Sequence, residues 1–390
     1  MIGKYHGFGK NVLDNIKTES KEKVYVVTSF VDEDKAGTLR YGINRVNSNS
    51  YTKILFGADG DIILKSPLTI KCRNLIIDGG GHDVVISDYP LNISASQNIL
   101  VQNISVRGSD LRVLEENRKN RVRRPKTSAN LDVINIDGSH TVAIYHCSLY
   151  WSADEIVSVT RSQNVTIGYC ILAYPLSNPK IHPYGDNHAY CSNNSASTVT
   201  YHHNIFAHFV MRGPQFEAND NNDKQSYNAQ FEAINNLIYG YTQSGSRYSI
   251  GFEERDDYVQ KIRIDYQFIS NIYVNTGDGV DIEVIDRYGS HVNYPNKKPS
   301  GPTRNDRINV VIEGNQSEEM EADVGADDRA GRRLFNTGIP IQKTKRAYDL
   351  IMAYAGNYNS RSNLDHSVIS DIATRARPKI AHSIKEFYGM

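Results

Sequence analysis

The sequence predicts an all-β chain that folds as a right-handed parallel β-helix with an N-terminal cap and short C-terminal helices. Three observations lead to this prediction. A short strand unit recurs along the chain, the connections between units vary in length, and no helical segments alternate with the strands as they would in a doubly wound fold. With 390 residues, the chain is long enough to bury a large core.

The repeated unit is a short strand, then Asn or Cys, then a second apolar pair. Asn or Cys occupies this column at Asn103, Cys147, Cys170, Asn204, Asn236 and Asn271. Such periods are typical of solenoids, in which each coil buries its apolar face against the next coil. We expect the Asn residues to turn the chain in the αL conformation and to hydrogen-bond along the column. A β-sandwich with chance similarity among its strands is the alternative.

The N-terminal residues 1–70 differ from the repeats. Strand patterns near Val26 and Ile54 flank a helical segment around Thr38–Ile43. The first coil of a stack leaves a row of unpaired strand edges. We therefore expect residues 1–70 to form the first coils and a cap over that open end.

Residues 71–316 are expected to form the central coils. Residues 317–390 begin with a charged segment poor in apolar residues, which predicts an exposed loop. Apolar patterns at 347–352 and 368–372 then predict short helices packed on the coil. Because no linker marks a boundary, we expect a single domain over residues 1–390.

Composition excludes several classes of partner. The chain has 44 basic and 44 acidic residues, so its net charge indicates neither nucleic acid nor a membrane surface. No segment approaches the apolar length that a membrane span requires. The first residues contain no apolar run, so we expect no signal peptide in this chain.

The four cysteines do not indicate a metal or redox motif. Cys72, Cys147, Cys170 and Cys191 form no CxxC pair. Cys147 and Cys170 occupy equivalent repeat positions. We therefore expect them to be stacked core thiols rather than a disulfide.

Oxygen-bearing side chains precede the strands of two successive coils. Asn130 and Asp132 precede one predicted strand, and Asp154 and Glu155 precede the next. Neighbouring strands lie about 4.8 Å apart, so carboxylates at matched positions would repel unless a hard cation such as Ca²⁺ binds them. Solvated turn acids are the alternative. Because Asp154 and Glu155 adjoin, we expect their side chains to point to opposite faces.

Arg212 stands out because it lies beside Gly213-Pro214, two coils beyond the acids. The similar repeat lines elsewhere carry no such arginine. This context favours a functional arginine over a surface charge or a salt-bridge partner, which are the usual roles of an arginine at a strand end.

The polar stretch 177–188 lies between the acidic coil and the arginine coil. It contains Lys180, His182 and His188, which are candidates for contact with an anion. Histidines in structural roles are the alternative.

A run of basic residues leads into the acidic coil and comprises Arg118, Lys119, Arg121, Arg123, Arg124 and Lys126. A solvated loop is one interpretation. Beside a cation site, contact with a polyanion is the other, and we take Arg123 and Arg124 as substrate contacts. Nucleic acid is disfavoured because no interleaved aromatic residues accompany the run.

Together these segments resemble the pectate lyase family of polysaccharide lyases, and the resemblance covers nearly the whole chain. Gly7–Val12, Gly37–Arg40 and Asn74–Gly81 look like the family's entry segments. Trp151–Val159 looks like its calcium coil, and Tyr201–Pro214 looks like its catalytic coil. The motifs are specific in combination, although each alone is weak.

The resemblance implies Ca²⁺-dependent β-elimination of polygalacturonate or a related uronic-acid polymer. Arg212 matches the catalytic base, and Lys180 matches a substrate-binding lysine. The positions that match the calcium site are Asp132, Asp154, Asn130 and Ser158. The resemblance also implies an acidic polysaccharide as partner, a secreted monomer, and no contact with nucleic acid or membrane.

Three departures from the family pattern bear on the substrate and the cation. Asn130 and Ser158 stand where the family often has carboxylates, which predicts weak calcium binding or binding mainly through the substrate. Tyr145-His146 stands where an Asp-His pair is common. Gln215–Glu217 lacks the second arginine that often follows the catalytic one, so the substrate and its methylation are open.

Two other functions remain alternatives. A polysaccharide hydrolase on the same scaffold needs two suitably placed carboxylates, and the Asn-Thr-Asp and Arg-Ile-Lys signatures of polygalacturonases are missing. A non-catalytic glycan-binding spike, as on phage tails, would be virion-associated and trimeric.

Overall fold

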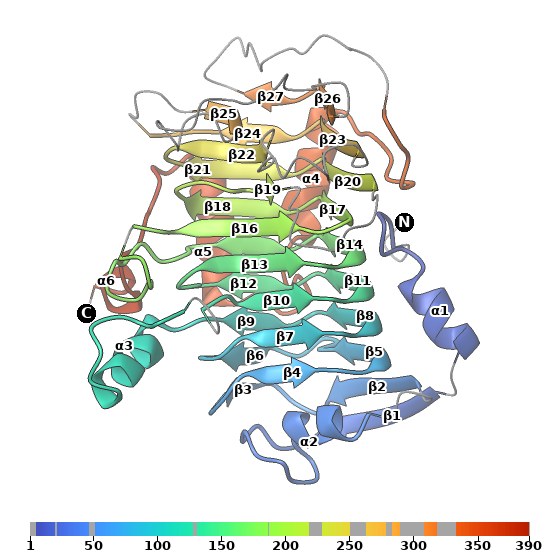
Figure 1. Cartoon of the computed structure of the whole chain (residues 1–390), viewed down its shortest axis with the longest axis vertical. Coiled ribbons are helices and arrows are strands. Elements are labelled where there is room, and N and C mark those ends of the chain that lie inside the picture. Colours follow the sequence, from blue (N-terminus) through green and yellow to red (C-terminus); the bar gives the residue numbers. More distant parts are fainter. Residues whose placement is uncertain are drawn as a thin grey trace, which may run out of the picture.

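The computed structural model describes residues 5–19, 22–46, 51–127, 131–185, 187–217, 228–249, 263–277, 283–288, 308–317 and 333–389. Across these residues the strands form three sheets that run the length of a stack of coils (Figure 1). The ten-stranded sheet consists of β1 (Glu22–Val27), β2 (Tyr51–Phe56), β5 (Arg73–Asp78), β8 (Gln97–Gln102), β11 (His140–Tyr145), β14 (Gln163–Gly168), β17 (Thr198–His202), β20 (Asn228–Ile234), β23 (Arg263–Ile269) and β26 (Ile308–Glu313).

The eight-stranded sheet faces the viewer in Figure 1 and carries the candidate site. It consists of β4 (Leu68–Ile70), β7 (Leu91–Ser94), β10 (Ile134–Asp137), β13 (Glu155–Thr160), β16 (Tyr190–Ser195), β19 (Gln215–Phe216), β22 (Ser244–Ser249) and β25 (Glu283–Tyr288). The nine-stranded sheet consists of β3 (Gly60–Ile63), β6 (Val84–Ser87), β9 (Ser105–Arg107), β12 (Ser148–Tyr150), β15 (Ile171–Ala173), β18 (Ile205–Phe209), β21 (Leu237–Tyr241), β24 (Ile272–Val274) and β27 (Gln316–Ser317).

Every strand pair in the described ranges is parallel, and each strand pairs with the equivalent strand of the coil before and after it. Successive coils therefore stack in a fixed register. The predicted right-handed parallel β-helix is confirmed.

An asparagine ladder runs through the interior where the ten-stranded sheet turns into the nine-stranded sheet. The backbone N–H of Asn204 donates to Oδ1 of Asn236 at 3.0 Å, that of Asn236 to Asn271 at 2.9 Å, and that of Asn271 to Asn315 at 2.8 Å. The predicted ladder is thus confirmed, and Asn315 extends it. Buried amides are satisfied by their neighbours along the stack.

The αL turn lies one residue before the ladder, so its predicted position was wrong. His203, Asn235 and Ser270 have φ of 56°, 53° and 52°. The αL residue bends the chain, and the following Asn can then bond to the next coil.

The aligned column is also offset by one residue at Asn103, which itself has φ of 55°. Gln102 pairs with Tyr145, so Asn103 stands opposite His146 and not opposite Cys147. Apolar residues on both sides of the turn hid this shift in the sequence.

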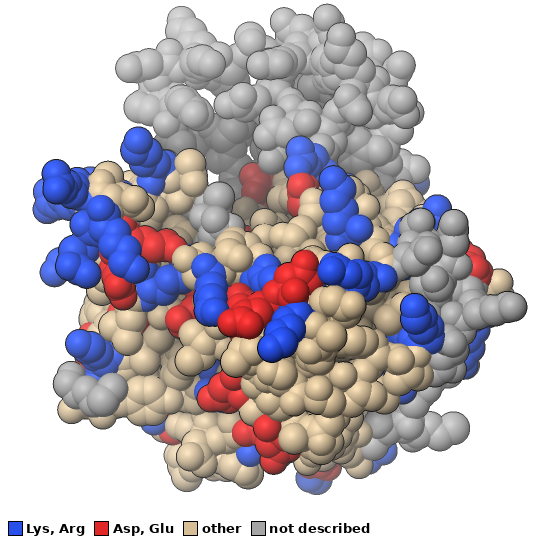
Figure 2. All heavy atoms as spheres, turned by 90° about the horizontal axis from the view of Figure 1, so that it is seen from below, with Lys and Arg blue, Asp and Glu red and all other residues tan. Residues whose placement is uncertain are grey.

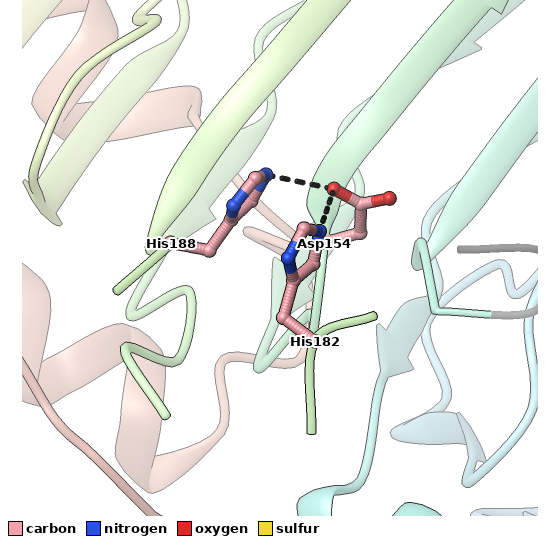
Figure 3. Close-up of side chains that lie close together, drawn as sticks. All are labelled: Asp154, His182 and His188. Carbon is pink, nitrogen blue, oxygen red and sulfur yellow. Dashed lines mark ion pairs between the residues drawn. The ribbon is translucent and has the colours of Figure 1, made fainter. Parts of the chain in front are cut away.

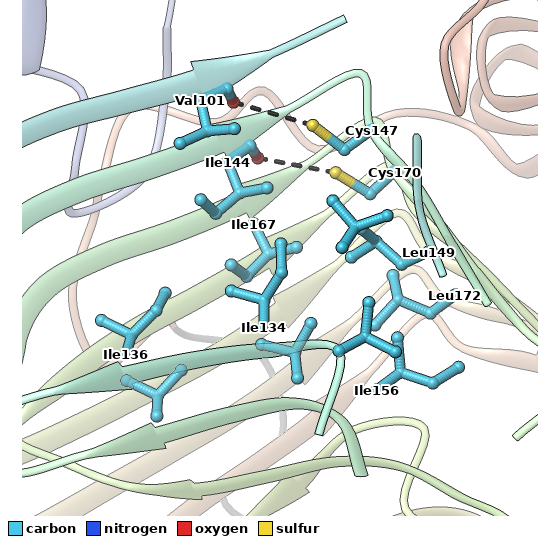
Figure 4. Close-up of a cluster of buried hydrophobic side chains, with 14 of the residues drawn as sticks. Val101, Ile134, Ile136, Ile144, Cys147, Leu149, Ile156, Ile167, Cys170 and Leu172 are labelled. Atoms are coloured by element: carbon cyan, nitrogen blue, oxygen red, sulfur yellow. Dashed lines mark hydrogen bonds between the residues drawn. The ribbon is translucent and has the colours of Figure 1, made fainter. Parts of the chain in front are cut away.

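In the part of the core that Figure 4 shows, aliphatic side chains from all three sheets fill the interior, and aromatic rings such as Phe206, Phe231 and Phe268 join them in later coils. Cys147 and Cys170 are buried free thiols within this core. Their Sγ atoms lie 3.8 Å and 3.6 Å from the carbonyl oxygens of Val101 and Ile144 on the preceding coils. The prediction of stacked core thiols without a disulfide is confirmed.

Two helices from the N-terminal part of the chain pack against the coils. α2 (Leu39–Asn44) lies at the open end of the stack beside β1 and β2, where the sequence predicted a cap (Figure 1). Thr38 accepts a hydrogen bond from the N–H of Tyr41 and begins this helix. α1 (Val12–Glu19) packs Val12 and Ile16 on the outer side of the ten-stranded sheet.

The C-terminal helices α4 (Thr344–Tyr354), α5 (Asn363–Thr374) and α6 (Ile384–Phe387) pack outside the nine-stranded sheet. This agrees with the predicted helices at 347–352 and 368–372. Most of the predicted charged loop, residues 318–332, lies outside the described residues. Within the described ranges, no helix has the length and apolar character needed to cross a membrane.

Candidate active site

Four successive coils align the central site residues where β10, β13, β16 and β19 of the eight-stranded sheet begin. The N–H of Glu155, the first residue of β13, donates to Oδ1 of Asp132 at 3.2 Å. Glu155 pairs with Tyr190 at the start of β16, and Tyr190 forms a parallel bridge with Met211. Arg212 follows directly. The register of the coils therefore brings these residues together although they span 80 positions of the sequence.

Asp132, Asp154 and Glu155 form a group of carboxylates that we call the acid cluster. One oxygen from each side chain lies within 4.8 Å of the others. The expectation that Asp154 and Glu155 point to opposite faces was therefore wrong. Side chains alternate only inside a strand, and Asp154 lies in the bend before β13.

Crowding of like charges changes the ionisation of the acid cluster. Burial, and then the charges of Asp154 and Glu155, raise the pKa of Asp132 well above its usual value. Burial and the charge of Asp154 raise the pKa of Glu155. The three carboxylates cannot all ionise without a cost in free energy, and a cation among them would lower that cost.

Two histidines from the loop between β15 and β16 face Asp154 (Figure 3). Nε2 of His188 lies 2.8 Å from Oδ1 of Asp154, and Nε2 of His182 lies 3.4 Å from the same oxygen. Although burial opposes ionisation, hydrogen bonds with these histidines lower the pKa of Asp154 well below its usual value. Burial alone would lower the pKa of His188, but Asp154 and Glu155 raise it to about 9.

Arg212 forms an ion pair with Glu155 and is held in a fixed backbone geometry. Its φ of 73° lies in the left-handed region. Gly213 follows because a Cβ there would stand 2.6 Å from the ring of Phe209. Its N–H donates to the carbonyl of Gly245 at 2.8 Å. The Gly-Pro context noted in the sequence thus fixes the direction in which the arginine leaves the coil.

A row of packed aromatic rings links the histidines to Arg212. The ring centroids of Tyr184 and His182 are 5.2 Å apart, those of His182 and His188 are 3.9 Å apart, and those of His188 and Tyr190 are 3.9 Å apart. The guanidinium carbon of Arg212 lies 4.3 Å from the centroid of Tyr190. The acid cluster, the histidines and the arginine therefore form one connected site.

Among the remaining residues that the sequence predicted as metal or substrate ligands, those that the structure describes lie at varying distances from the acid cluster. Ser158 lies on β13, and its side chain opposes the rise in the pKa of Asp132. Asn130 lies outside the described residues. Lys180 is exposed on the loop that carries the two histidines, whereas His182 is 1% exposed and buried against Asp154.

The basic run begins in α3 (Asp110–Lys119) and continues into the segment after it. Arg123 is exposed, and Arg124 packs against Gly185 so closely that a Cβ there would have no room. The side-chain amide of Asn117 donates to the carbonyl of Lys180 at 3.3 Å. Figure 2 shows basic side chains gathered at the left edge, the side on which α3 lies in Figure 1. The basic segment thus borders the histidine loop.

The acid cluster fits a calcium ion by its donors and dimensions. Oxygens bind Ca²⁺ at about 2.3–2.6 Å, so two ligands on opposite sides of one ion are about 5 Å apart. The oxygens of Asp132, Asp154 and Glu155 all lie within 4.8 Å of one another. Burial first, and then the charge of neighbouring carboxylates, raise the pKa values of Asp132 and Glu155, and a cation held by the cluster would offset the second cause.

Sequence reasoning missed Glu155 as the partner of Arg212, and it missed Tyr190. It named His188 only as one of three candidates for anion contact. Two signals pointed to these residues: the Asp154-Glu155 pair just before a strand, and two histidines six positions apart in one loop.

Curated proteins similar to this chain are pectate lyases. Pectate lyase 2 of Ambrosia artemisiifolia is 35% identical over 155 residues, which are 38% of this chain and 38% of that protein. The pectate trisaccharide-lyase of Thermotoga maritima is 26% identical over 166 residues, or 42% of each chain. The match thus spans about two-fifths of the length of these relatives. No family model matches the chain.

Solved structures resemble the whole fold. The pollen allergen Jun a 1 of cedar superposes with a TM-score of 0.55 and 17% identity over 90% of this chain and 92% of that chain. A Bacillus pectate lyase in complex with trigalacturonate gives a TM-score of 0.55 and 15% identity over 90% and 98%. At these identities the superpositions establish the shared fold. The resemblance to the pectate lyase family is confirmed by the sequence relatives together with this fold.

Proposed function

We propose that this relative of the pectate lyases is a polysaccharide lyase that cleaves polygalacturonate, or a related uronic-acid polymer, by calcium-assisted β-elimination. The observation that carries the proposal is the acid cluster in direct contact with Arg212. The names of the curated relatives support the substrate class. A polymer of this kind is degraded outside cells, so we also propose an extracellular site of action.

Asp132, Asp154 and Glu155 would hold the calcium ion, with the hydroxyl of Ser158 beside them. When bound, Ca²⁺ would neutralise the uronate carboxylate and stabilise the negative charge that develops as the C5 proton leaves. Because the described ligands include a serine hydroxyl where the family often has a carboxylate, we propose modest affinity for Ca²⁺ without substrate.

Arg212 would accept the proton from C5. The electron pair of the C5–H bond would form the C4=C5 double bond, the C4–O bond would break, and the leaving oxygen would be protonated by solvent. A neutral guanidine is costly because its intrinsic pKa lies above about 12. The ion pair with Glu155 favours the protonated form of Arg212. The reaction therefore requires Glu155 to give up this pair in the substrate complex.

The substrate would lie along the outer face of the eight-stranded sheet. The register places Ser158, Asn193, Gln215 and Arg247 in one polar row across successive coils. The amide of Gln215 donates to Asn193 at 3.1 Å. Such a row offers hydrogen bonds to sugar hydroxyls.

Cationic side chains border the same face. Lys180 and Arg123 are exposed, and Arg124 packs beside the histidine loop. We propose that these three residues attract the carboxylates of the polymer.

A hydrolase remains the second candidate because the acid cluster keeps carboxylates close together. Retaining glycosidases use two carboxyl groups about 5–5.5 Å apart, one of them with a raised pKa. Glu155 has a raised pKa and lies beside Asp154. The contact with Arg212 and the named relatives favour the lyase.

The test is a substrate screen with two readouts. Pectate, methylated pectin, alginate and glucuronate-bearing capsules are incubated with and without Ca²⁺, and both ultraviolet absorbance and new reducing ends are recorded. A lyase gives absorbance from the unsaturated uronate, and a chelator abolishes it. Reducing ends without this absorbance indicate the hydrolase. Neither signal, with glycan binding retained, indicates a non-catalytic binder.

A further inference from the structure

Asp154, His182 and His188 form a compact donor group of two imidazoles and one carboxylate (Figure 3). The distances from Asp154 Oδ1 to the two Nε2 atoms are 2.8 Å and 3.4 Å. Nitrogen and oxygen ligands lie about 2.0–2.2 Å from a zinc ion, so two ligands of one tetrahedral ion are about 3.4 Å apart. The spacing of the three side chains is therefore close to that of a metal-binding triad.

We propose that this triad binds one divalent transition-metal ion of the zinc type. Imidazole is a ligand for Zn²⁺, Co²⁺ and Ni²⁺, whereas Ca²⁺ takes oxygen ligands. The proposal concerns ligand binding and does not rest on the lyase function proposed above. The triad shares only Asp154 with the all-oxygen acid cluster.

Burial and charge favour a dication at this place. Asp154, His182 and His188 are 8%, 1% and 7% exposed. Asp132 and Glu155 add two more carboxylates within 4.8 Å of Asp154. Arg212 pairs with Glu155, one of these acids. A dication bound to the triad would reduce the repulsion among these three carboxylates.

The protein holds the two imidazoles in place before any ion arrives. Their rings stack on each other and are flanked by Tyr184 and Tyr190. One end of the loop is tied to the preceding coil because the N–H of Leu176 donates to the carbonyl of Ser152 at 2.9 Å. The two ends are tied together because the N–H of Ala189 donates to the carbonyl of Leu176 at 3.2 Å. Preoriented ligands lose little conformational entropy on binding a metal.

Asp154 is oriented for a bridging role. Figure 3 shows one of its oxygens directed at both histidines and the other pointing away from the rings. A metal on the histidine side therefore leaves the second oxygen available to the acid cluster. With three protein ligands, a fourth position remains open for water or a substrate oxygen, as in catalytic zinc sites.

A proton is the competing occupant, because an imidazolium of His188 would also bridge to Asp154. Isothermal titration distinguishes the two. The full-length, tag-free protein is stripped with a chelator and titrated with Zn²⁺ and separately with Ca²⁺. We expect one Zn²⁺ per chain, and Ca²⁺ should not displace it. With Co²⁺ in place of Zn²⁺, visible absorption bands should report nitrogen and oxygen ligation.

The variants H182Q and H188Q should each weaken Zn²⁺ binding at least tenfold. The matched control is H140Q, which removes an exposed histidine and should leave the affinity unchanged. Circular dichroism of the metal-free variants checks that each is folded. Absence of stoichiometric binding, equal binding after both triad substitutions, or an equal loss in H140Q would overturn the proposal. None of these outcomes depends on lyase activity.

Discussion

Two of the places where the chain buries acidic side chains have opposite surroundings. Glu232 on β20 is 0% exposed, and its carboxylate accepts hydrogen bonds from Thr200 at 3.0 Å, from Gln267 at 2.7 Å and from Thr337. Arg333 lies 3.9 Å away. A single charge is thus surrounded by donors. The acid cluster instead places three carboxylates within 4.8 Å of one another.

Burial alone therefore does not distinguish a structural acid from a functional one. Burial raises the pKa of Glu232 and of Asp132 alike. The neighbours differ. Hydrogen bonds from Thr337, Gln267 and Thr200 lower the pKa of Glu232. The charges of Asp154 and Glu155 raise the pKa of Asp132 further. An acid that the fold satisfies contributes to stability, and acids that the fold leaves crowded are available to a cation.

The largest expected effect separates catalysis from stability. The change R212K keeps the positive charge but loses the planar guanidinium beside Glu155 and Tyr190. We expect lyase activity to fall by about 10²–10³-fold, the usual cost of losing a group that acts on developing charge, with an unchanged melting temperature. Initial rates of unsaturated product formation measure it.

The matched control for this change is R161K. Arg161 is exposed in the bend that follows β13 and pairs with Asp137. It should retain full activity. Near-normal turnover in R212K, or equal losses in both variants, would refute the assignment of Arg212.

Substitutions in the two acid sites should affect stability in opposite directions. E232Q presents an amide N–H₂ group to residues that are themselves donors, and we expect a loss of about 3 kcal/mol in the free energy of unfolding. D132N removes one charge from a crowded group and should leave stability unchanged or increase it. Urea unfolding without divalent ions measures both, and a larger loss in D132N would contradict the comparison.

Calcium should stabilise the wild-type protein through the acid cluster. A ligand at a hundred times its Kd adds about 2.7 kcal/mol to the free energy of unfolding. We expect the melting temperature to rise with Ca²⁺ and to return after chelation. D154N should show no such response, whereas E232Q should keep it. A response that survives D154N would place the ion elsewhere.

A third buried acid supplies the smallest expected effect. Burial opposes ionisation of Asp371 on α5, but His208 and Lys379 lower its pKa to about 2. An acid with a lowered pKa stabilises the fold above its unfolded pKa and loses that contribution as the pH falls through the folded value. Between about pH 4 and pH 2, wild type should therefore lose about 2 kcal/mol that D371N never had. Parallel unfolding curves of the two proteins would contradict this.

The stack and the meeting of Asp132 with Asp154 could be predicted because parallel coils repeat one pattern at one spacing. The alignment was wrong by one residue at Asn103 because apolar residues lie on both sides of the turn. Two alignments that differ by one position therefore match the repeat equally well. The contact of Glu155 with Asp154 was missed because it depends on where β13 begins. His188 enters the site through a loop whose path no periodicity encodes, and the start of β16 at Tyr190 depends on where that loop ends.

The most direct test of the proposed site is a crystal structure of the R212K variant with Ca²⁺ and trigalacturonate. We predict a calcium ion about 2.3–2.6 Å from oxygens of Asp132 and Asp154, with a uronate carboxylate on the same ion and C5 of that sugar facing position 212. A sugar bound on another face of the coil, or an acid cluster that holds no ion beside a bound sugar, would contradict the proposed elimination.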